Sequence, residues 1–524
     1  VASLPVTDSY FSPKVKESTR AFYSASNQTK WLGNVAPTEL FYAFTNNVKQ
    51  SDQYGLRPDD YAITSIEESV KSLYASSPID SSAIIKLDIG ITSMFFLFSS
   101  HLVEGRLQKA GHGSKIWIRE NSKTTDLVAI LFGIDKPEKL REAMNHLQPV
   151  HEQYAKLLQA LDQYRYLDKV SPQIEGAIAV TGKIQPNDHH AAIPLIRDRI
   201  SYTDMRPDSL MRDSLRYDEA LVSAVKWFQL RHGLEPDGII GAGTLKFLNQ
   251  SFKEKADIIA LNLERLRWIP ETYGDNYIVV NLPEYKMSVF EDKKFALEMK
   301  VIVGSAETPT PVFADTLRHI VFSPTWSVPT SIIKNEIIPR LQRDSSYYSS
   351  KNYVFYKGGV RIDPANEIWR DQTINPYSLS VVQQPGPDNS LGLVKFVMPN
   401  HMNIYLHDTP GQRLFKRSYR ALSHGCIRLD EPAELAEFLL KDQRGWDEEA
   451  IAKAMRGEQP ATLFIKKMYR VQLEYYTAWV DENGLVNFRE DIYGHDKYQL
   501  ALLNPKKKQT KEEVNIIDIS GAGN

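Results

Sequence analysis

The chain has 524 residues, a length that predicts about three domains at about 150 residues each. Hydrophobic residues make up 42% of it, enough for several buried cores, and its formal net charge is −2. This balance excludes the electrostatic attraction that nucleic-acid binding requires, so we expect no nucleic-acid partner.

The first 180 residues are predicted to be mainly helical. In residues 64–74 and 137–166, apolar positions recur every three or four residues with charged positions between them. The most apolar stretch, 89–102, is shorter than the about 20 residues that cross a bilayer, so we expect a buried helix there. Residues 1–180 are therefore predicted to form a helical scaffold domain, completed by the helical pattern at 251–270.

Residues 181–250 have a different pattern, which predicts a separate module with helices and tight turns. Leu221, Val225 and Phe228 mark an amphipathic helix, and the pair Asp237-Gly238 marks a turn after it.

From about residue 275 the apolar pattern changes to a period of two, which indicates strands. Strands are expected at 277–282, 287–290, 296–303, 319–322, 393–397 and 403–406, and the sequence Asp481-Glu-Asn-Gly484 predicts a hairpin turn. The polar segment 334–388 within this mostly β domain, 271–504, is expected to be loop-like, either a functional lid or a disordered insertion. With a loose charged tail at 505–524, the predicted fold class is multidomain α+β.

Cys426 is the only cysteine, so it has no partner for an internal disulfide and cannot build a Cys-rich zinc site. It is either a buried spectator or a reactive thiol. A reactive cysteine must lose its proton, and His407 and His424 are both candidates to accept it. Gly425 permits a tight turn that frees the amides of Gly425 and Cys426 for an oxyanion, and Arg428 supplies a planar cation.

These residues resemble a known family. The sequence Tyr405-Leu-His407-Asp408, followed by Ser423-His424-Gly425-Cys426-Ile427-Arg428, is similar to the signature of L,D-transpeptidases of the YkuD fold. Segments 323–329, 336–339 and 392–396 extend the resemblance, and 181–250 resembles a peptidoglycan-binding domain of the small three-helix type. The resemblance also implies that 334–388 is a capping lid over the donor stem. The order of the domains is similar to that of the large YcbB-type enzymes of Gram-negative bacteria.

The resemblance implies a reaction. Cys426 attacks the carbonyl between the L-centre of diaminopimelate and D-alanine of a donor tetrapeptide stem, D-alanine leaves, and the amine of an acceptor stem resolves the thioester as a 3→3 cross-link. His407 is the implied general base and His424 its assistant, with the amides of Gly425 and Cys426 as the oxyanion hole. For substrate binding we expect the side chains Tyr405, Arg428, Ser423 and Trp326; a core position for Trp326 is the alternative.

The resemblance also implies that no metal or organic cofactor is required, that carbapenems acylate the enzyme, and that it works in the periplasm of a Gram-negative bacterium. Because the sequence starts at Val1 rather than Met, we expect that a leading segment was removed. A cleaved signal peptide and a retained inner-membrane anchor both stay open, as does the oligomeric state.

Four alternatives remain from the sequence. An L,D-carboxypeptidase would use the same residues with water as the acceptor. A serine acyl-enzyme would use Ser331-Ile-Ile-Lys334, which fits the S-x-x-K pattern. A zinc peptidase would use His407, Asp408 and His424. A non-catalytic wall-binding scaffold would need only the module at 181–250.

Overall fold

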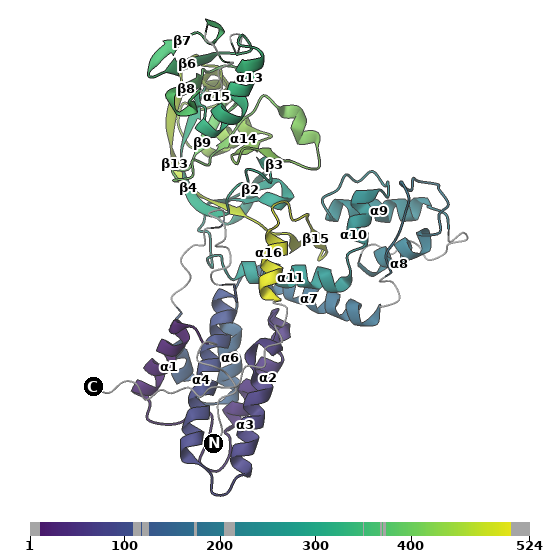
Figure 1. Cartoon of the computed structure of the whole chain (residues 1–524), viewed down its shortest axis with the longest axis vertical. Helices are drawn as coiled ribbons and strands as arrows, with labels where there is room; N and C mark the ends of the chain where they lie inside the picture. The colour runs from purple at the N-terminus through teal and green to yellow at the C-terminus, as the bar shows by residue number, and fades with distance from the viewer. Residues whose placement is uncertain are drawn as a thin grey trace. The chain divides into compact units, whose positions relative to one another are not determined.

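The computed structural model describes residues 11–107, 117, 125–171, 176–203, 215–348, 351–366, 369 and 374–504, drawn in Figure 1. It divides into two compact units. The first comprises 1–113, 119–271 and 477–524, and the second comprises 114–118 and 272–476. The predicted tail at 505–524 lies outside the described residues.

The first unit is built mainly of helices. They are α1 (Pro13–Ala25), α2 (Glu39–Lys49), α3 (Ile63–Ala75), α4 (Ser81–Glu104), α5 (Leu127–Gly133), α6 (Pro137–His146), α7 (Glu152–Val170), α8 (Ile193–Thr203), α9 (Glu219–Arg231), α10 (Ala242–Leu248), α11 (Phe252–Leu266) and α16 (His495–Leu503). The helical pattern at 137–166 corresponds to two helices, because α6 ends at His146 and α7 begins at Glu152. Pro149 lies in this break, where a proline would remove a helical hydrogen bond and clash with the preceding turn.

Helix α4 is the central helix of the N-terminal core, as predicted for residues 89–102. By length and composition it could cross a membrane, but most of its residues are buried inside the protein. Its buried Asp88 accepts hydrogen bonds from the amides of Trp31 (2.7 Å) and Leu32 (2.9 Å). These bonds satisfy a charge that would otherwise be costly to bury, so α4 serves here as a core helix.

The helices α8, α9 and α10 enclose a separate small core. The buried amide of Gln229 in α9 organises the turn that follows: its Nε2 donates to Asp237 Oδ1 (2.9 Å), and its Oε1 accepts from the Gly238 amide (2.8 Å). Gly238 has a φ of 75°, a conformation that favours glycine. The predicted turn at Asp237-Gly238 is confirmed.

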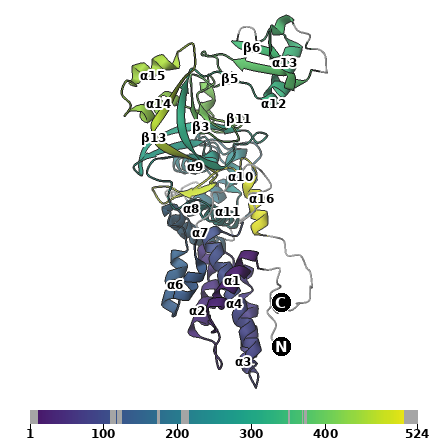
Figure 2. The ribbon, with the colours of Figure 1, turned by 90° about the vertical axis from the view of Figure 1, so that its left-hand side faces the viewer.

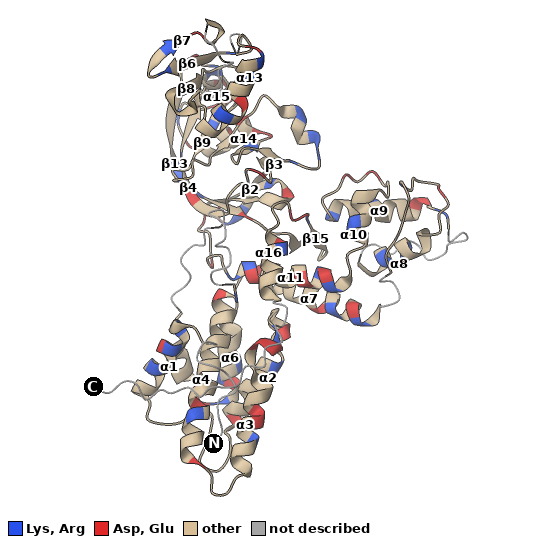
Figure 3. Ribbon diagram, viewed as in Figure 1, with Lys and Arg blue, Asp and Glu red and all other residues tan. Residues whose placement is uncertain are grey.

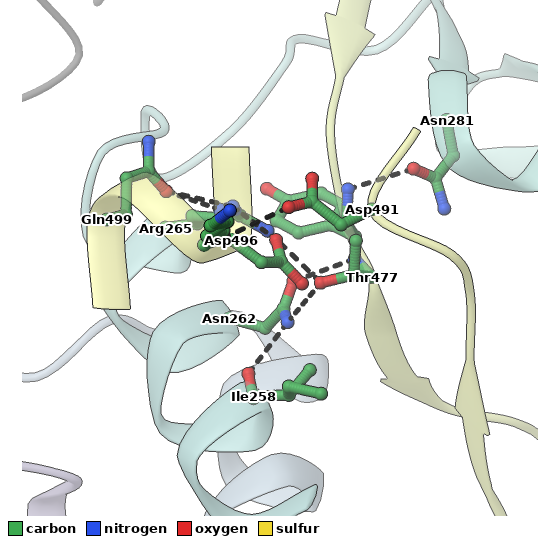
Figure 4. A network of polar contacts seen from close by, with 10 residues as sticks. Ile258, Asn262, Arg265, Asn281, Thr477, Asp491, Asp496 and Gln499 are labelled. Atoms are coloured by element: carbon green, nitrogen blue, oxygen red, sulfur yellow. Dashed lines mark hydrogen bonds and ion pairs between the residues drawn. The ribbon is translucent and has the colours of Figure 1, made fainter. Parts of the chain in front are cut away.

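A buried arginine joins the last segment of the chain to α11 within the first unit (Figure 4). Arg265 Nη2 lies 2.7 Å from Asp496 Oδ1 of α16 and its Nη1 donates to Thr477 Oγ1 at 3.2 Å. Asn262 Oδ1 accepts from the Thr477 amide at 3.0 Å. Because the ion pair is almost fully buried, removal of either partner alone would leave an uncompensated charge.

Charges of both signs alternate along α7 and α11 (Figure 3). In two ion pairs the partners lie one helical turn apart on the same helix. Lys156 Nζ is 2.7 Å from Glu152 Oε1, and Lys253 Nζ is 2.7 Å from Asp257 Oδ2. Exposed pairs of this kind each stabilise a helix by about 0.3–0.5 kcal/mol, so these are solvated helix faces.

The second unit is organised around a nine-stranded sheet. Its strands are β1 (Tyr277–Asn281), β2 (Lys286–Glu291), β3 (Lys294–Gly304), β4 (Phe313–Phe322), β9 (Val394–Val397), β10 (Leu406–His407), β11 (Ala421–Ser423), β12 (Ile427–Leu429) and β13 (Ala461–Glu474). Their order is β11-β3-β12-β10-β9-β4-β13-β1-β2, and β2 also pairs with β3, so the sheet closes on itself. Helices α14 (Pro432–Leu440) and α15 (Glu448–Met455) follow β12.

The strands predicted at 277–282, 287–290 and 296–303 correspond to β1, β2 and β3. The strand predicted at 403–406 is wrong in extent, because β10 contains only Leu406 and His407. Asn403 has a φ of 55°, and Asn400 Oδ1 accepts from the amides of Met402 and Ile404, both at 3.1 Å. This side chain makes a turn where the pattern indicated a strand.

The segment 334–388 is not the loop-like segment that we expected. It belongs to a small lobe with its own four-stranded sheet, of order β5-β8-β6-β7. Its elements are β5 (Trp326–Ser327), α12 (Thr330–Ile332), a π-helical turn (Ile333–Ile337), α13 (Ile338–Arg343), β6 (Tyr353–Lys357), β7 (Val360–Ile362) and β8 (Leu379–Gln383). Figure 2 shows the lobe beside the main sheet. Phe355, Trp369 and Val381 are buried in its core.

The hairpin predicted at 481–484 is confirmed. Strands β14 (Ala478–Val480) and β15 (Val486–Phe488) are antiparallel, and the Asp481 amide donates to the Leu485 carbonyl at 2.9 Å. Gly484 takes a φ of 77° in the turn. The predicted multidomain α+β class, with a helical N-terminal region, a small helical module and a mostly β domain, is also confirmed.

Candidate active site

Three side chains stand side by side on neighbouring strands of the main sheet. His407 of β10 is opposite Lys395 of the antiparallel strand β9 and opposite Arg428 of the parallel strand β12. Side chains alternate between the two faces of a strand, so cross-strand partners point to the same face. The neighbouring row of Leu406, Phe396 and Ile427 is buried. The sheet therefore presents a His flanked by two cations on one face and packs its apolar face inward.

Cys426 ends a tight loop that follows β11. The Ser423 hydroxyl accepts from the Gly425 amide at 3.1 Å and donates to the Cys426 carbonyl at 2.6 Å. The buried hydroxyl of Thr310 donates to the Gly425 carbonyl at 2.7 Å. Gly425 has a φ of 114°, which an L side chain rarely adopts. The loop is therefore fixed from both sides just before the sulfur.

This geometry bears on two of the expected roles. The Gly425 amide, expected in the oxyanion hole, is already satisfied by Ser423 in this structure. Ser423, expected to bind substrate, is buried and uses its hydroxyl to shape the loop, although it lines the pocket. Among the described residues, the Cys426 amide has no hydrogen-bond partner, so it can donate to a ligand in the pocket.

Cys426 lies in a pocket of about 840 Å³ and is partly accessible. Its Sγ atom is 3.6 Å from the Asn403 carbonyl. Burial raises the pKa of the Cys426 thiol, while hydrogen bonds from Tyr405 and the charges of Arg428 and Lys395 offset part of this rise. Tyr405 is half-buried, and burial together with a charge on Cys426 raises the pKa of its hydroxyl. Tyr405 is therefore a neutral donor facing the sulfur.

His407 is buried in the same pocket, and its ring orientation is fixed by a backbone carbonyl. Its Nδ1 donates to the Asp408 carbonyl at 2.5 Å, which leaves Nε2 as the basic nitrogen. The Asp408 carboxylate instead accepts from the amides of Leu393 (2.8 Å) and Thr409 (2.6 Å). Burial, assisted by Arg428, lowers the pKa of His407 to about 3, so the imidazole is neutral at pH 7.

His424 points to a partner that the sequence did not reveal. Its Nε2 lies 2.6 Å from Glu336 Oε1, on the π-helical turn of the lobe, and both side chains are about half exposed and line the pocket. The pair couples the nucleophile loop to the lobe.

Trp326 and Arg428 also line the pocket. Trp326 is half-buried and its ring meets Tyr353 of the lobe edge-on at 6.5 Å. It therefore combines the pocket-lining position with the core position that had been its alternative.

The alternatives can be placed in this geometry. Ser331 is exposed and also lines the pocket, while Lys334 is exposed but does not. For zinc, His424 is paired with Glu336, the Asp408 carboxylate is held by backbone amides, and the described residues contain no group of three metal-ligating side chains.

The sequence missed Lys395 and Glu336. Lys395 carries a signal, since it is a lysine between Val394 and Phe396, both buried, in a strand of the sheet. Glu336 carries none, because only the fold brings it to a histidine 88 residues away.

Comparison with protein-family models decides the family of the site. Residues 275–448, which include all of these catalytic candidates, match the model of the YkuD "L,D-transpeptidase catalytic domain". The chain carries a YkuD-type L,D-transpeptidase domain. Residues 17–161 match a "Scaffold domain" and 204–248 a "Putative peptidoglycan binding domain".

One curated relative and two solved structures are similar to parts of the chain. A "Putative L,D-transpeptidase" of Haemophilus influenzae is 38% identical over 248 residues, which cover 47% of this chain and 50% of the relative. The chain thus spans about half the length of the curated relative it matches. An L,D-transpeptidase from Mycobacterium smegmatis is 12% identical, with 38% of this chain and 58% of that chain covered and a TM-score of 0.19. One from Xylanimonas cellulosilytica is 12% identical, with 57% and 100% covered and a TM-score of 0.18. These structural likenesses are too weak to bear on the activity.

Proposed function

We propose that this L,D-transpeptidase domain forms 3→3 cross-links between diaminopimelate residues of peptidoglycan stems, through a thioester on Cys426. The observation that carries the proposal is the position of Cys426, which lies in an open pocket with a neutral His407 and two cations, inside the segment that matches the catalytic family. The match of 204–248 to a peptidoglycan-binding model supports peptidoglycan as the substrate.

The first half of the reaction forms the thioester. His407 Nε2 takes the proton of Cys426 as Sγ attacks the carbonyl carbon between diaminopimelate and the terminal D-alanine of the donor stem. The Cys426 amide and the Tyr405 hydroxyl are the donors near the developing oxyanion. The C–N bond then breaks, His407 returns the proton to the leaving amine, and D-alanine departs.

The second half transfers the acyl group. The side-chain amine of the acceptor's diaminopimelate attacks the thioester carbonyl, His407 accepts its proton, and the C–S bond breaks to restore the Cys426 thiol. If water attacks instead, the product is a tripeptide stem and the domain acts as an L,D-carboxypeptidase. Since both fates share one acyl-enzyme, the acceptor alone decides between them.

Because the resting thiol and imidazole are both favoured in their neutral forms, proton transfer accompanies attack rather than preceding it. A neutral pair also protects the thiol from oxidation in an oxidising compartment, since the thiolate is the reactive form. This supports the further proposal that the enzyme works in the periplasm of a Gram-negative bacterium, where carbapenems would acylate Cys426.

The proposed function is tested with purified disaccharide-tetrapeptide. Wild type is expected to release D-alanine and to accumulate 3→3 dimers, and Cys426→Ala is expected to produce neither. Ser331→Ala is the matched variant, because Ser331 is exposed and lines the same pocket, and it should keep the activity. Activity retained by Cys426→Ala would refute the proposal, and tripeptide without dimers would assign the carboxypeptidase reaction instead.

A further inference from the structure

The pocket around Cys426 has an uneven distribution of charge. Its cationic side chains are Lys395 and Arg428, and its carboxylate side chain is Glu336. Glu336 is already paired with His424. Neither cation forms an ion pair with a described residue, and the buried Nε atom of Arg428 has no hydrogen-bond partner among them. The pocket therefore holds two uncompensated positive charges.

Both cations lie close to the nucleophile. The positive charge of each favours the thiolate of Cys426 and so lowers its pKa. Both residues are cross-strand neighbours of His407 in the main sheet. The Lys395 ammonium is 5.5 Å from the centre of the Tyr405 ring, which itself hydrogen-bonds the sulfur. The half-buried position of Lys395 and this cation–π contact restrict its ammonium to the neighbourhood of the thiol.

A lysine at this position is costly unless it meets an anion. Burial lowers the pKa of Lys395, which shows that its charge is poorly solvated. A strand position beside buried Val394 and Phe396 could carry an uncharged residue without loss of packing. The charge is therefore best explained by a ligand that brings negative charge to this end of the pocket.

We propose that Lys395, together with Arg428, forms a carboxylate subsite that binds the free C-terminal carboxylate of the donor peptide. The inference rests on the proposed function, because it needs a donor whose scissile bond reaches Cys426. Successive Cα atoms of a peptide are about 3.8 Å apart, so the carboxylate of the departing D-amino acid lies one residue from the attacked carbonyl. A subsite for it must therefore adjoin the thiol, as Lys395 and Arg428 do. Lys395 is then a specificity-determining residue that selects peptides ending one residue beyond the scissile bond.

The subsite is tested with two synthetic donors, a tetrapeptide ending in D-alanine and the same peptide ending in D-alaninamide. Cleavage of either releases an amine from the same carbonyl, but only the first presents a carboxylate. The wild-type kcat/KM is expected to favour the acid by about 10- to 100-fold, the range that a hydrogen bond to a charged group contributes. Equal kcat/KM values for the two donors in the wild type would overturn the proposal without any variant.

Variants assign the preference to Lys395. Lys395→Met keeps most of the length of the side chain and should lower kcat/KM for the acid by about 10- to 100-fold more than for the amide, so the preference disappears. Lys395→Arg should retain the preference. Lys334→Met removes an exposed lysine outside the pocket and should change neither donor. A Lys395→Met enzyme that loses both donors equally, with the preference intact, would show a structural role and overturn the assignment.

The proposed function and the carboxylate subsite are refuted by different results. If neither donor forms an adduct on Cys426 in the wild type, the proposed function is wrong. If adducts form at equal rates from acid and amide, the thioester chemistry stands and the carboxylate subsite is wrong.

Discussion

His424 Nε2 and Glu336 Oε1 lie 2.6 Å apart. They connect the loop between β11 and β12, which carries Cys426, with the small lobe that begins at β5. The two residues are 88 positions apart in the chain, and each is about half exposed. An exposed pair of this kind contributes about 0–1 kcal/mol to stability. Its main effect is therefore on the position of the loop relative to the lobe.

Glu336→Ala is expected to lower kcat/KM for acylation by about three- to tenfold, while thermal unfolding changes little. The cause is loss of the anchor that holds His424 and the loop before Cys426. Glu336→Gln, which still accepts a hydrogen bond, should recover most of the rate. Glu482→Ala, an exposed glutamate in the β14–β15 turn, is the matched control. An unchanged kcat/KM for Glu336→Ala would show that the pair does not position the loop.

Thr310 is predicted to be essential for the geometry of the nucleophile loop. Its buried hydroxyl accepts from the Gly304 amide at 2.8 Å and donates to the Gly425 carbonyl at 2.7 Å. Thr310→Val keeps the shape of the side chain but leaves the Gly304 amide and the Gly425 carbonyl without this hydrogen-bond partner. The loss lowers the free energy of unfolding by about 1–3 kcal/mol. We expect slower acylation of Cys426 as well, measured by mass spectrometry. Thr310→Ser should restore both properties, and Thr462→Val, at an exposed position of β13, should alter neither.

The reactivity of the resting thiol should depend on pH in a characteristic way. Burial raises the pKa of Cys426 and lowers that of His407 to about 3, so both groups are neutral at pH 7. Alkylation by iodoacetamide should therefore rise with pH with a midpoint above the about 8.5 of a free cysteine. Lys395→Met should move the midpoint higher, because a cation that favours the thiolate is lost. Fast alkylation at pH 5 would instead reveal a thiolate–imidazolium pair.

A buried carboxyl at the end of β13 should affect the pH dependence of stability. Glu474 accepts a hydrogen bond from the Tyr273 hydroxyl, and burial raises the pKa of Glu474 from 4.5 to about 7. The folded state therefore binds more protons than the unfolded state between these values, and the stabilisation from this group is lost as pH rises through about 7. Urea unfolding should show Glu474→Gln gaining stability relative to wild type between pH 5 and pH 8. A relative loss over this interval would contradict the assignment.

The sequence predicted the parts of the fold in which local pattern and tertiary packing agree. Strands β1 to β3 follow the period-two alternation because one face of each packs inward. The hairpin at 481–484 was predictable from turn residues alone. The folded lobe over 334–388 was not predicted, because its polar composition conceals the apolar residues of its core, among them Phe355, Trp369 and Val381.

The candidate site was predictable where its residues are close in sequence. The segment from Tyr405 to Arg428 supplied the thiol, the base and one cation. Lys395 and Glu336 depend on strand register and on the folding of a distant lobe, which no local pattern specifies. The structural role of Ser423, whose hydroxyl bonds to the Gly425 amide and the Cys426 carbonyl, also depends on the folded loop.

The proposed reaction requires that a donor stem acylates Cys426. Its most direct test is intact-mass and peptide-level mass spectrometry of the enzyme quenched in acid during turnover of a tetrapeptide donor. We expect a mass increase equal to the tripeptide acyl group, located on Cys426 and labile to hydroxylamine, with an equal amount of D-alanine released. D-Alanine release without any adduct on Cys426, or an adduct located on Ser331, would contradict it.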